Sequence, residues 1–237
     1  AIVADSTRIR GADHPDTLVT RQHWLNSLSM TGRYKEALAG STPLLAAMDK
    51  RFGPDHSFTL ALHSTRFESY SALGQYPEAA REAEIVWKGA AAKAGPHSHQ
   101  ALVGQIDYAS ALCQTPRKQE AIGLARSALD ASRSALGADY PLTHAIRYFT
   151  AECLIANGRF TEAGQMIGAV DRKKVAQLIG NPDFDATADV ALADVAVGNH
   201  DKAEARRLLD KAAPALAKTK DEILRARADK LKGSLAS

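Results

Sequence analysis

The sequence predicts an all-α fold built as a linear array of helical hairpins. A glycine-headed stretch recurs every 42 residues, as GADHPDTL at 11–18, GPDHSFTL at 53–60, GPHSHQAL at 95–102 and GADYPLTH at 137–144. A second landmark keeps the same period, with Glu-Ala pairs at 36–37, 78–79, 120–121 and 162–163. The chain between these landmarks has helical periodicity. A period of this length is typical of solenoids, in which each unit buries its apolar face against the next.

Each repeat is expected to hold two helices. In the first copy, PDTLVTRQHWLNSLSM has leucines at 18, 25 and 28, a spacing that places them close together on a helix. Proline in its first turn is typical of a helix start. The second segment, YKEALAGSTPLLAAMDKRF, carries Ala37, Leu44, Leu45 and Met48 along one side, and its Pro43 is expected to kink it. No stretch alternates with period two, so we expect no sheet.

The turn between the two helices has its own pattern, Gly–x–aromatic–x–Glu–Ala. Glycine tolerates the left-handed conformation that ends a helix, and the small alanine allows two helices to cross closely. The aromatic residue is expected to fill the gap between the paired helices. The third copy departs from the pattern, because Pro116 and Lys118 replace the glycine and the aromatic residue. We therefore expect the third turn to be irregular.

These residues resemble the tetratricopeptide repeat (TPR) in its long form of 42 residues, typical of kinesin light chains and many bacterial regulatory proteins. The pattern G-x-D-H-P-x-T-L … G-x-Y-x-E-A is matched almost fully in the first two copies and loosely in the fourth. The third copy is weaker, and a shortened fifth is clear only at VGNHDKA (197–203). The resemblance implies a right-handed α-α superhelix, here of about five helix-turn-helix repeats.

The repeat pattern also sets the expected boundaries. Residues 1–10 are expected to be the end of a truncated preceding repeat. Full repeats are expected at 11–52, 53–94, 95–136 and 137–179, with a degenerate fifth at 180–217. Residues 218–237 are expected to form a capping helix, because their leucines share one side and charged residues the other.

The residues give no support for catalysis, a cofactor or a metal. Asp13–His14 recurs as Asp55–His56, so it is expected to cap or brace the following helix at each repeat. The only close histidine pair, in HSH at 97–99, lacks a third ligand nearby in sequence. No nucleophile elbow, phosphate-binding loop, dinucleotide fingerprint or zinc spacing is present. We therefore expect a protein that is not an enzyme.

Composition further limits the kinds of partner that the chain is expected to bind. The net charge is only +3, without the concentrated basic stripe of a nucleic-acid-binding face. No apolar run is long enough to span a membrane, and no signal peptide is visible. Two cysteines are too few for a disulfide framework. The chain is therefore expected to act in the cytoplasm, without nucleic acid or membrane as its partner.

The resemblance implies a concave groove, lined by the first helix of each repeat, that holds a peptide or a partner helix. Carried over by the Gly–x–aromatic landmark, the groove residues are Gln22, Asn26, Ser29, Ser64, Glu68, Ser71, Ile106, Ser110, Gln114, Tyr148 and Glu152. Asn26 matches an asparagine of the clamp with which chaperone-binding members hold a terminal carboxylate, but the lysines of that clamp are absent. Since Glu68 and Glu152 repel carboxylates, a basic or neutral segment is favoured.

Two functions follow from these features. The first is a non-catalytic module that binds a peptide or protein segment, as part of a larger bacterial regulatory or signalling protein. The alternative is a sensor for a small ligand or signal peptide that controls an attached kinase or DNA-binding domain. A saturable response to a small molecule, with altered helix packing, distinguishes the second from the first. Self-association through the terminal repeat faces is a further possibility.

Overall fold

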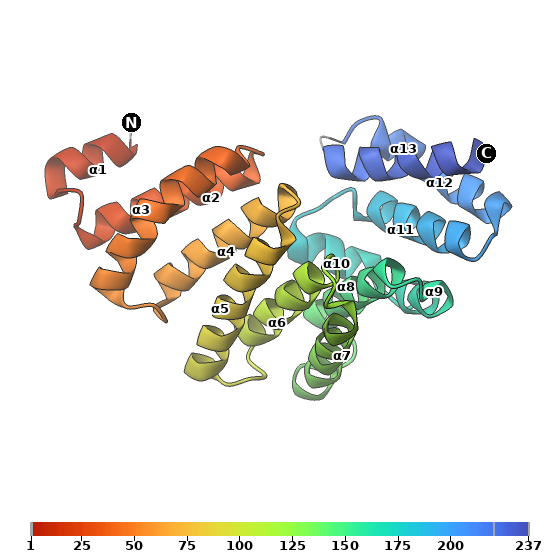
Figure 1. Ribbon diagram of the computed structural model, residues 1–237, viewed down its shortest axis with the longest axis horizontal. Helices are drawn as coiled ribbons and strands as arrows, with labels where there is room; N and C mark the ends of the chain where they lie inside the picture. The colour runs from red at the N-terminus through yellow and green to blue at the C-terminus, as the bar shows by residue number, and fades with distance from the viewer. Residues whose placement is uncertain (1, 220, 237) are drawn as a thin grey trace. The chain divides into compact units, whose positions relative to one another are not determined.

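The computed structural model describes residues 2–219 and 221–236, and these residues form α-helices joined by short turns, with no strand among them (Figure 1). The helices are α1 (Ile2–Arg10), α2 (Pro15–Met30), α3 (Tyr34–Phe52), α4 (Ser57–Ala72), α5 (Tyr76–Ala94), α6 (His99–Leu112), α7 (Lys118–Ala135), α8 (Pro141–Ala156), α9 (Phe160–Gly168), α10 (Arg172–Ile179), α11 (Phe184–Gly198), α12 (Lys202–Leu216) and α13 (Glu222–Ala236). The chain divides into two compact units, Ala1–Arg117 and Lys118–Ser237.

In the first unit, helices follow one another as packed neighbours from α1 to α6, and α2 also packs against α4. The hairpin turns between α2 and α3 and between α4 and α5 contain Gly32 and Gly74, at φ values of 80° and 71°. Both glycines have the left-handed conformation that the sequence pattern predicts. Helix α3 continues through Pro43.

The Asp-His stretches cap helices, as expected from their repetition. The Nδ1 atom of His14 accepts a hydrogen bond from the backbone N–H of Asp16 at 3.2 Å, at the start of α2. His56 makes the equivalent bond to the N–H of Phe58 at 3.3 Å, at the start of α4. The recurring histidine therefore satisfies a backbone donor that helix geometry leaves without a partner.

Small residues allow the helices of the first unit to approach closely. The alanines of the Glu-Ala pairs, Ala37 and Ala79, are fully buried. Where α5 meets α6, a Cβ atom added at Gly104 would lie 2.7 Å from the Cα of Trp87. That distance is too short for any side chain, so the crossing of α5 and α6 depends on glycine.

The turn of the third repeat is the irregular one, as predicted. Helices α6 and α7 are separated by residues 113–117, whereas the turns with glycine occupy only 31–33, 73–75 and 157–159. Proline cannot adopt the positive φ of the glycine turns, so Pro116 requires a longer connection. The boundary between the two compact units falls at the end of this turn.

In the second unit, the fourth repeat differs from the expected helix-turn-helix unit. Its second helix is broken into α9 and α10 at residues 169–171. Two buried residues of α8 hold the break: Arg147 donates to the carbonyl of Ala169 at 2.9 Å, and His144 Nδ1 accepts from the N–H of Asp171 at 3.1 Å. The Asp171 side chain then caps α10. The expectation of one continuous helix here was wrong, because α8 supplies partners for backbone groups that a helix would otherwise pair.

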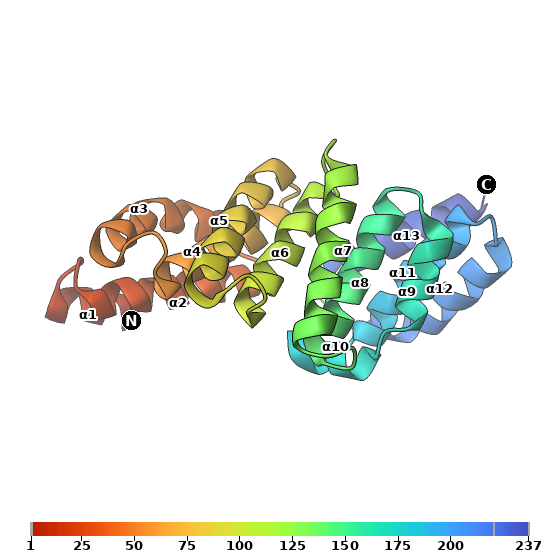
Figure 2. The same ribbon diagram turned by 90° about the horizontal axis from the view of Figure 1, so that it is seen from below.

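Helices α11, α12 and α13 pack side by side (Figure 2). The side of α13 that packs against α11 and α12 carries Leu224, Ala228, Leu231 and Leu235, which are all buried. They join alanines and leucines of α11 and α12 in one core. The apolar stripe that the sequence pattern indicates for this segment is therefore buried.

Candidate partner-binding surface

Four of the predicted groove residues are inaccessible. The side chains of Gln22, Ser29, Ile106 and Tyr148 are buried. Ser29 receives a hydrogen bond from Ser69 Oγ at 3.1 Å, between α2 and α4. Ser29 therefore links α2 to α4, and burial keeps all four side chains from a partner.

The other seven predicted residues retain exposed surface. They are Asn26, Ser64, Glu68, Ser71, Ser110, Gln114 and Glu152. Asn26 is engaged in part, since its Oδ1 accepts a bond from Thr65 at 3.5 Å. Ser64, Glu68 and Ser71 recur at alternating intervals of four and three residues, so they share one face of α4.

A pocket of about 510 Å³ opens on this face of α4. Its α4 residues, Ser57, Leu60, Ala61 and Ser64, lie at the N-terminal end of the same stripe. Helix α5 contributes Val86, Ala90, Lys93 and Ala94, and α6 contributes Gln100. The lining is mostly aliphatic, which suits apolar side chains of a ligand. We call the stripe on α4, this pocket and residues Asp107 and Ser110 of α6 the α4–α6 surface.

An acidic pair lies on the same surface. Burial raises the pKa of Asp107 to about 7, and the charge of Glu68 raises it further. The pKa of Glu68 is also raised, because the surrounding protein shields its carboxylate from water. Neither carboxylate has a hydrogen bond or an ion pair to any residue that the structure describes. Two neighbouring acids without a cation are poorly stabilised as anions.

The other buried charges of this unit are paired. Glu82 of α5 accepts a hydrogen bond from His63 at 2.6 Å and another from Arg66 Nε at 2.8 Å. Burial opposes ionisation of Glu82, but these two partners outweigh it and lower its pKa overall. Arg66 also donates to Ser41 at 2.8 Å, which ties α3, α4 and α5 together. Arg66 is therefore committed to Glu82, not to Glu68.

In the second unit, Glu152 already has a cation. Arg227 of α13 donates to both carboxylate oxygens of Glu152, at 3.1 and 3.0 Å. The same guanidinium reaches Asp194 of α11 at 3.2 and 3.0 Å. Tyr148 donates to Glu152 at 2.6 Å. The groove position that the sequence assigned to a partner is thus filled by the chain's own C-terminal helix.

A second buried acid in this unit is neutralised in the same way. Asp189 of α11 is almost fully buried and pairs with Arg172 at 2.8 Å and with Lys211 at 2.9 Å. These contacts link α11 to α10 and α12. Such fully paired charges are typical of structural interactions, not of a vacant binding site.

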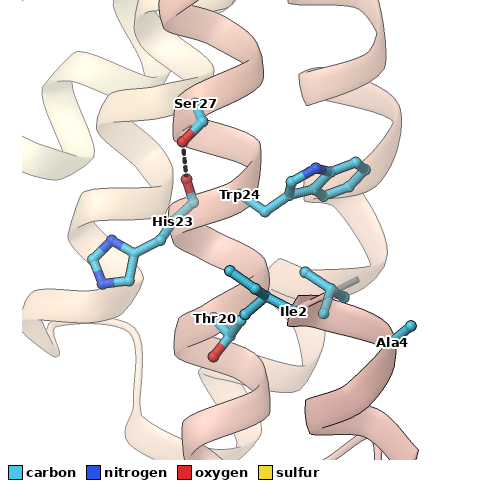
Figure 3. A pocket seen from close by; sticks show the side chains of 7 residues that line it. Ile2, Ala4, Thr20, His23, Trp24 and Ser27 are labelled. Carbon is cyan, nitrogen blue, oxygen red and sulfur yellow. Dashed lines mark hydrogen bonds between the residues drawn. The ribbon is translucent and has the colours of Figure 1, made fainter.

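A larger and more open pocket, of about 710 Å³, lies between α1 and α2 (Figure 3). It is lined by Ile2, Val3, Ala4, Thr20, His23, Trp24 and Ser27. Trp24 is 48% exposed and Ile2 is 77% exposed. Ser27 Oγ donates to the carbonyl of His23 at 2.9 Å, so this hydroxyl is satisfied within the chain. The surface is apolar, but no charge or shape selects a ligand for it.

The described residues hold no group of three or more His, Cys, Asp or Glu side chains that could bind a metal. Among the helices of that part of the chain, none is both long and apolar enough to cross a membrane.

Comparisons with known proteins agree with this architecture. No family model matches the chain, and no curated protein matches its sequence. Among solved structures, the nearly identical TPR-like repeats of a putative kinesin light chain from Podosopora anserina match with a TM-score of 0.61 and 23% identity, over 88% of this chain and 99% of that one. The fold is TPR-like. BtubC (BKLC) from P. vanneervenii matches with a TM-score of 0.67 and 15% identity, over 93% of this chain and 90% of that one.

Sequence reasoning missed part of the TPR-like chain's candidate surface. Asp107 was not predicted, although it lies one helical turn before Ser110, which was. The aliphatic lining from α5, Val86 and Ala90, was also missed. The repeat pattern places groove residues on first helices alone, so it carries no signal for the second helix that forms the floor of a pocket.

Proposed function

We propose that the chain is a non-catalytic protein-interaction module that binds a segment of a partner protein on the α4–α6 surface. The observation that carries this proposal is the aliphatic pocket of about 510 Å³ on the same face of α4 as the unpaired Glu68. Apolar lining beside a few polar groups is the usual composition of a ligand site. The TPR-like fold supports the proposal, because it presents its first helices as a continuous face.

The proposal includes the wider role expected from the family resemblance, in which the chain is part of a larger bacterial regulatory protein. It restricts binding to the first unit. In the second unit the equivalent acids are paired with Arg227, so that part of the predicted groove is not assigned to a partner.

Selection of displayed peptides tests the proposal. Random 16-residue peptides on phage would be selected against the full chain and against a Ser64→Trp variant, in which the indole occupies the pocket. Ala46→Trp, which places the same side chain on the exposed surface of α3, is the matched control. We expect peptides that bind the wild type and the control equally and lose binding to Ser64→Trp.

Circular dichroism and thermal unfolding must show that both variants fold like the wild type. Peptides that bind all three proteins equally would contradict the assignment of the site. A failure to select any peptide would contradict the proposed function itself.

A further inference from the structure

Glu68 and Glu152 occupy the same position in their repeats. With the period of 42 residues, positions 68, 110, 152 and 194 are equivalent, and they hold Glu, Ser, Glu and Asp. In the second unit, two neighbouring repeats therefore place Glu152 and Asp194 at this position. In the first unit, the neighbouring repeats place Glu68 and Ser110 there. Asp107 lies three residues before Ser110, on the same side of α6. It therefore provides the first unit with a second acid next to Glu68, as Asp194 does next to Glu152.

The second unit shows what such a pair binds. Arg227 projects from α13 and forms bonds of 3.0–3.2 Å with the carboxylates of Glu152 and Asp194. Burial would lower the pKa of Arg227, but the two carboxylates outweigh burial and raise it. The helix that carries Arg227 is amphipathic, with Leu224, Ala228 and Leu231 buried in the neighbouring core. One guanidinium on an amphipathic helix thus bridges acids of two repeats.

The pair in the first unit has no such cation within the described part of the chain. The basic side chain nearest in sequence to Glu68 is that of Arg66, which is bonded to Glu82 and Ser41. Lys93 lines the pocket next to Ser57, about three helical turns along α4 from Glu68. Burial raises the pKa of both Asp107 and Glu68, the charge of Glu68 raises that of Asp107 further, and no cation among the described residues offsets these effects.

We propose that Glu68 and Asp107 bind the guanidinium of an arginine on a helical segment of the partner, while apolar side chains of the same helix enter the pocket lined by Leu60, Val86 and Ala90. This inference rests on the proposed function and adds the chemistry of the partner. The stripe from Ser57 to Ser71 is about 21 Å long, which matches a partner helix of roughly 14 residues. A planar, forked guanidinium suits two carboxylates better than a lysine ammonium does.

The chain itself supplies a probe. A synthetic peptide of residues 221–236, DEILRARADKLKGSLA, carries the arginine and the apolar stripe of α13. Its binding to the full chain would be measured by isothermal titration calorimetry at pH 8, beside the same peptide with Arg227→Gln. The protein would be compared with the double variant Glu68→Gln, Asp107→Asn. The double variant Asp49→Asn, Asp130→Asn, which removes two exposed acids elsewhere, is the matched control.

We expect saturable binding of the arginine peptide to the wild type and to the control. Binding should weaken by about ten-fold or more when either the peptide arginine or the acidic pair is removed. Removing both should weaken it little further, because the two changes disrupt one interaction. Preserved structure of the double variants is verified by circular dichroism.

Two results would overturn the inference while leaving the proposed function intact. The first is binding that Ser64→Trp abolishes but that neither Arg227→Gln in the peptide nor the acidic double variant weakens. The second is no binding of the arginine peptide, although phage selection yields other peptides that require the pocket. If selection yields no peptide and the arginine peptide does not bind, the proposed function fails together with the inference.

Discussion

The two units of this chain differ in whether the acidic side chains at one repeat position are paired with a cation. In the second unit, Glu152 and Asp194 are bridged by Arg227 from the C-terminal helix. In the first unit, Glu68 and Asp107 stand on the corresponding face without a cation among the described residues, and the pKa of Asp107 is about 7. We infer from this difference that the acidic position of the second unit is stabilised within the chain, whereas that of the first unit is open to a cation from a partner.

Removal of the built-in cation has the largest expected effect. Arg227→Ala leaves two partly buried carboxylates without a cation, although Glu152 keeps its bond from Tyr148, and should lower the free energy of unfolding by about 2–3 kcal/mol. Urea denaturation followed by circular dichroism measures the change. Arg225→Ala, on the exposed side of α13, is the matched control and should cost less than about 0.5 kcal/mol. Equal effects of the two variants would show that the bridge is not a stabilising interaction.

Asp107→Asn should stabilise the folded chain, whereas Arg227→Ala should destabilise it. Because the folded-state pKa of Asp107 is above its unfolded value, the folded chain binds a proton more tightly, and stability falls as pH rises from about 4 to about 7. Asparagine removes this penalty, so the variant should be more stable than the wild type by about 1–3 kcal/mol at pH 8 and by little at pH 4. Denaturation at the two pH values tests this. A variant that is equally or less stable than the wild type at pH 8 would contradict the unpaired state of Asp107.

A substitution that makes the second unit resemble the first should lower the free energy of unfolding by a smaller amount. Asp194→Ser places at position 194 the residue that position 110 holds, and leaves Arg227 paired with Glu152 alone. We expect a loss of about 1 kcal/mol, smaller than the loss for Arg227→Ala, because no carboxylate is then left unpaired. A double-mutant cycle with Arg227→Ala measures the coupling between the two side chains. Additive effects would mean that Arg227 and Asp194 do not interact.

Glu68→Gln should have the smallest effect on stability, below about 0.5 kcal/mol, because much of the side chain is exposed even though neighbouring residues partly shield its carboxylate from water. The substitution should act mainly on the pKa of the neighbouring Asp107. Removing the charge of Glu68 should lower the pKa of Asp107, since that charge is one of its two causes. Carboxyl carbon NMR of the variant follows the titration of Asp107 directly. An unchanged titration would show that the two acids do not form a pair.

Much of the fold was predictable because the repeat constrains it at many positions. The glycine turns, the buried alanines such as Ala79, and the histidine caps all follow from local backbone chemistry. The irregular third turn followed from Pro116 and Lys118, which replace the glycine and the aromatic residue of the pattern. The break between α9 and α10 did not, because it depends on Arg147 and His144 of another helix. No local pattern reveals a partner supplied from elsewhere in the chain.

The candidate surface was predictable only in part, for a related reason. The landmark located Ser64 and Glu68 on the accessible face of α4, but it also assigned Gln22 and Tyr148, which the structure buries. It assigned Glu152 without indicating that Arg227, 75 residues away in the chain, occupies it. Repeat register gives the direction in which a side chain points. Whether that direction leads to solvent depends on which other helices cover it.

The most direct test of the central claim is the titration of Asp107 in the full chain, measured by carboxyl carbon NMR with and without the peptide of residues 221–236. The claim predicts a midpoint near pH 7 for the free chain. It predicts a clearly lower midpoint with saturating arginine peptide, because a bound guanidinium stabilises the ionised carboxylate. The peptide with Arg227→Gln should leave the midpoint unchanged. A midpoint that the arginine peptide does not move would contradict the claim that the acidic pair of the first unit binds a partner's arginine.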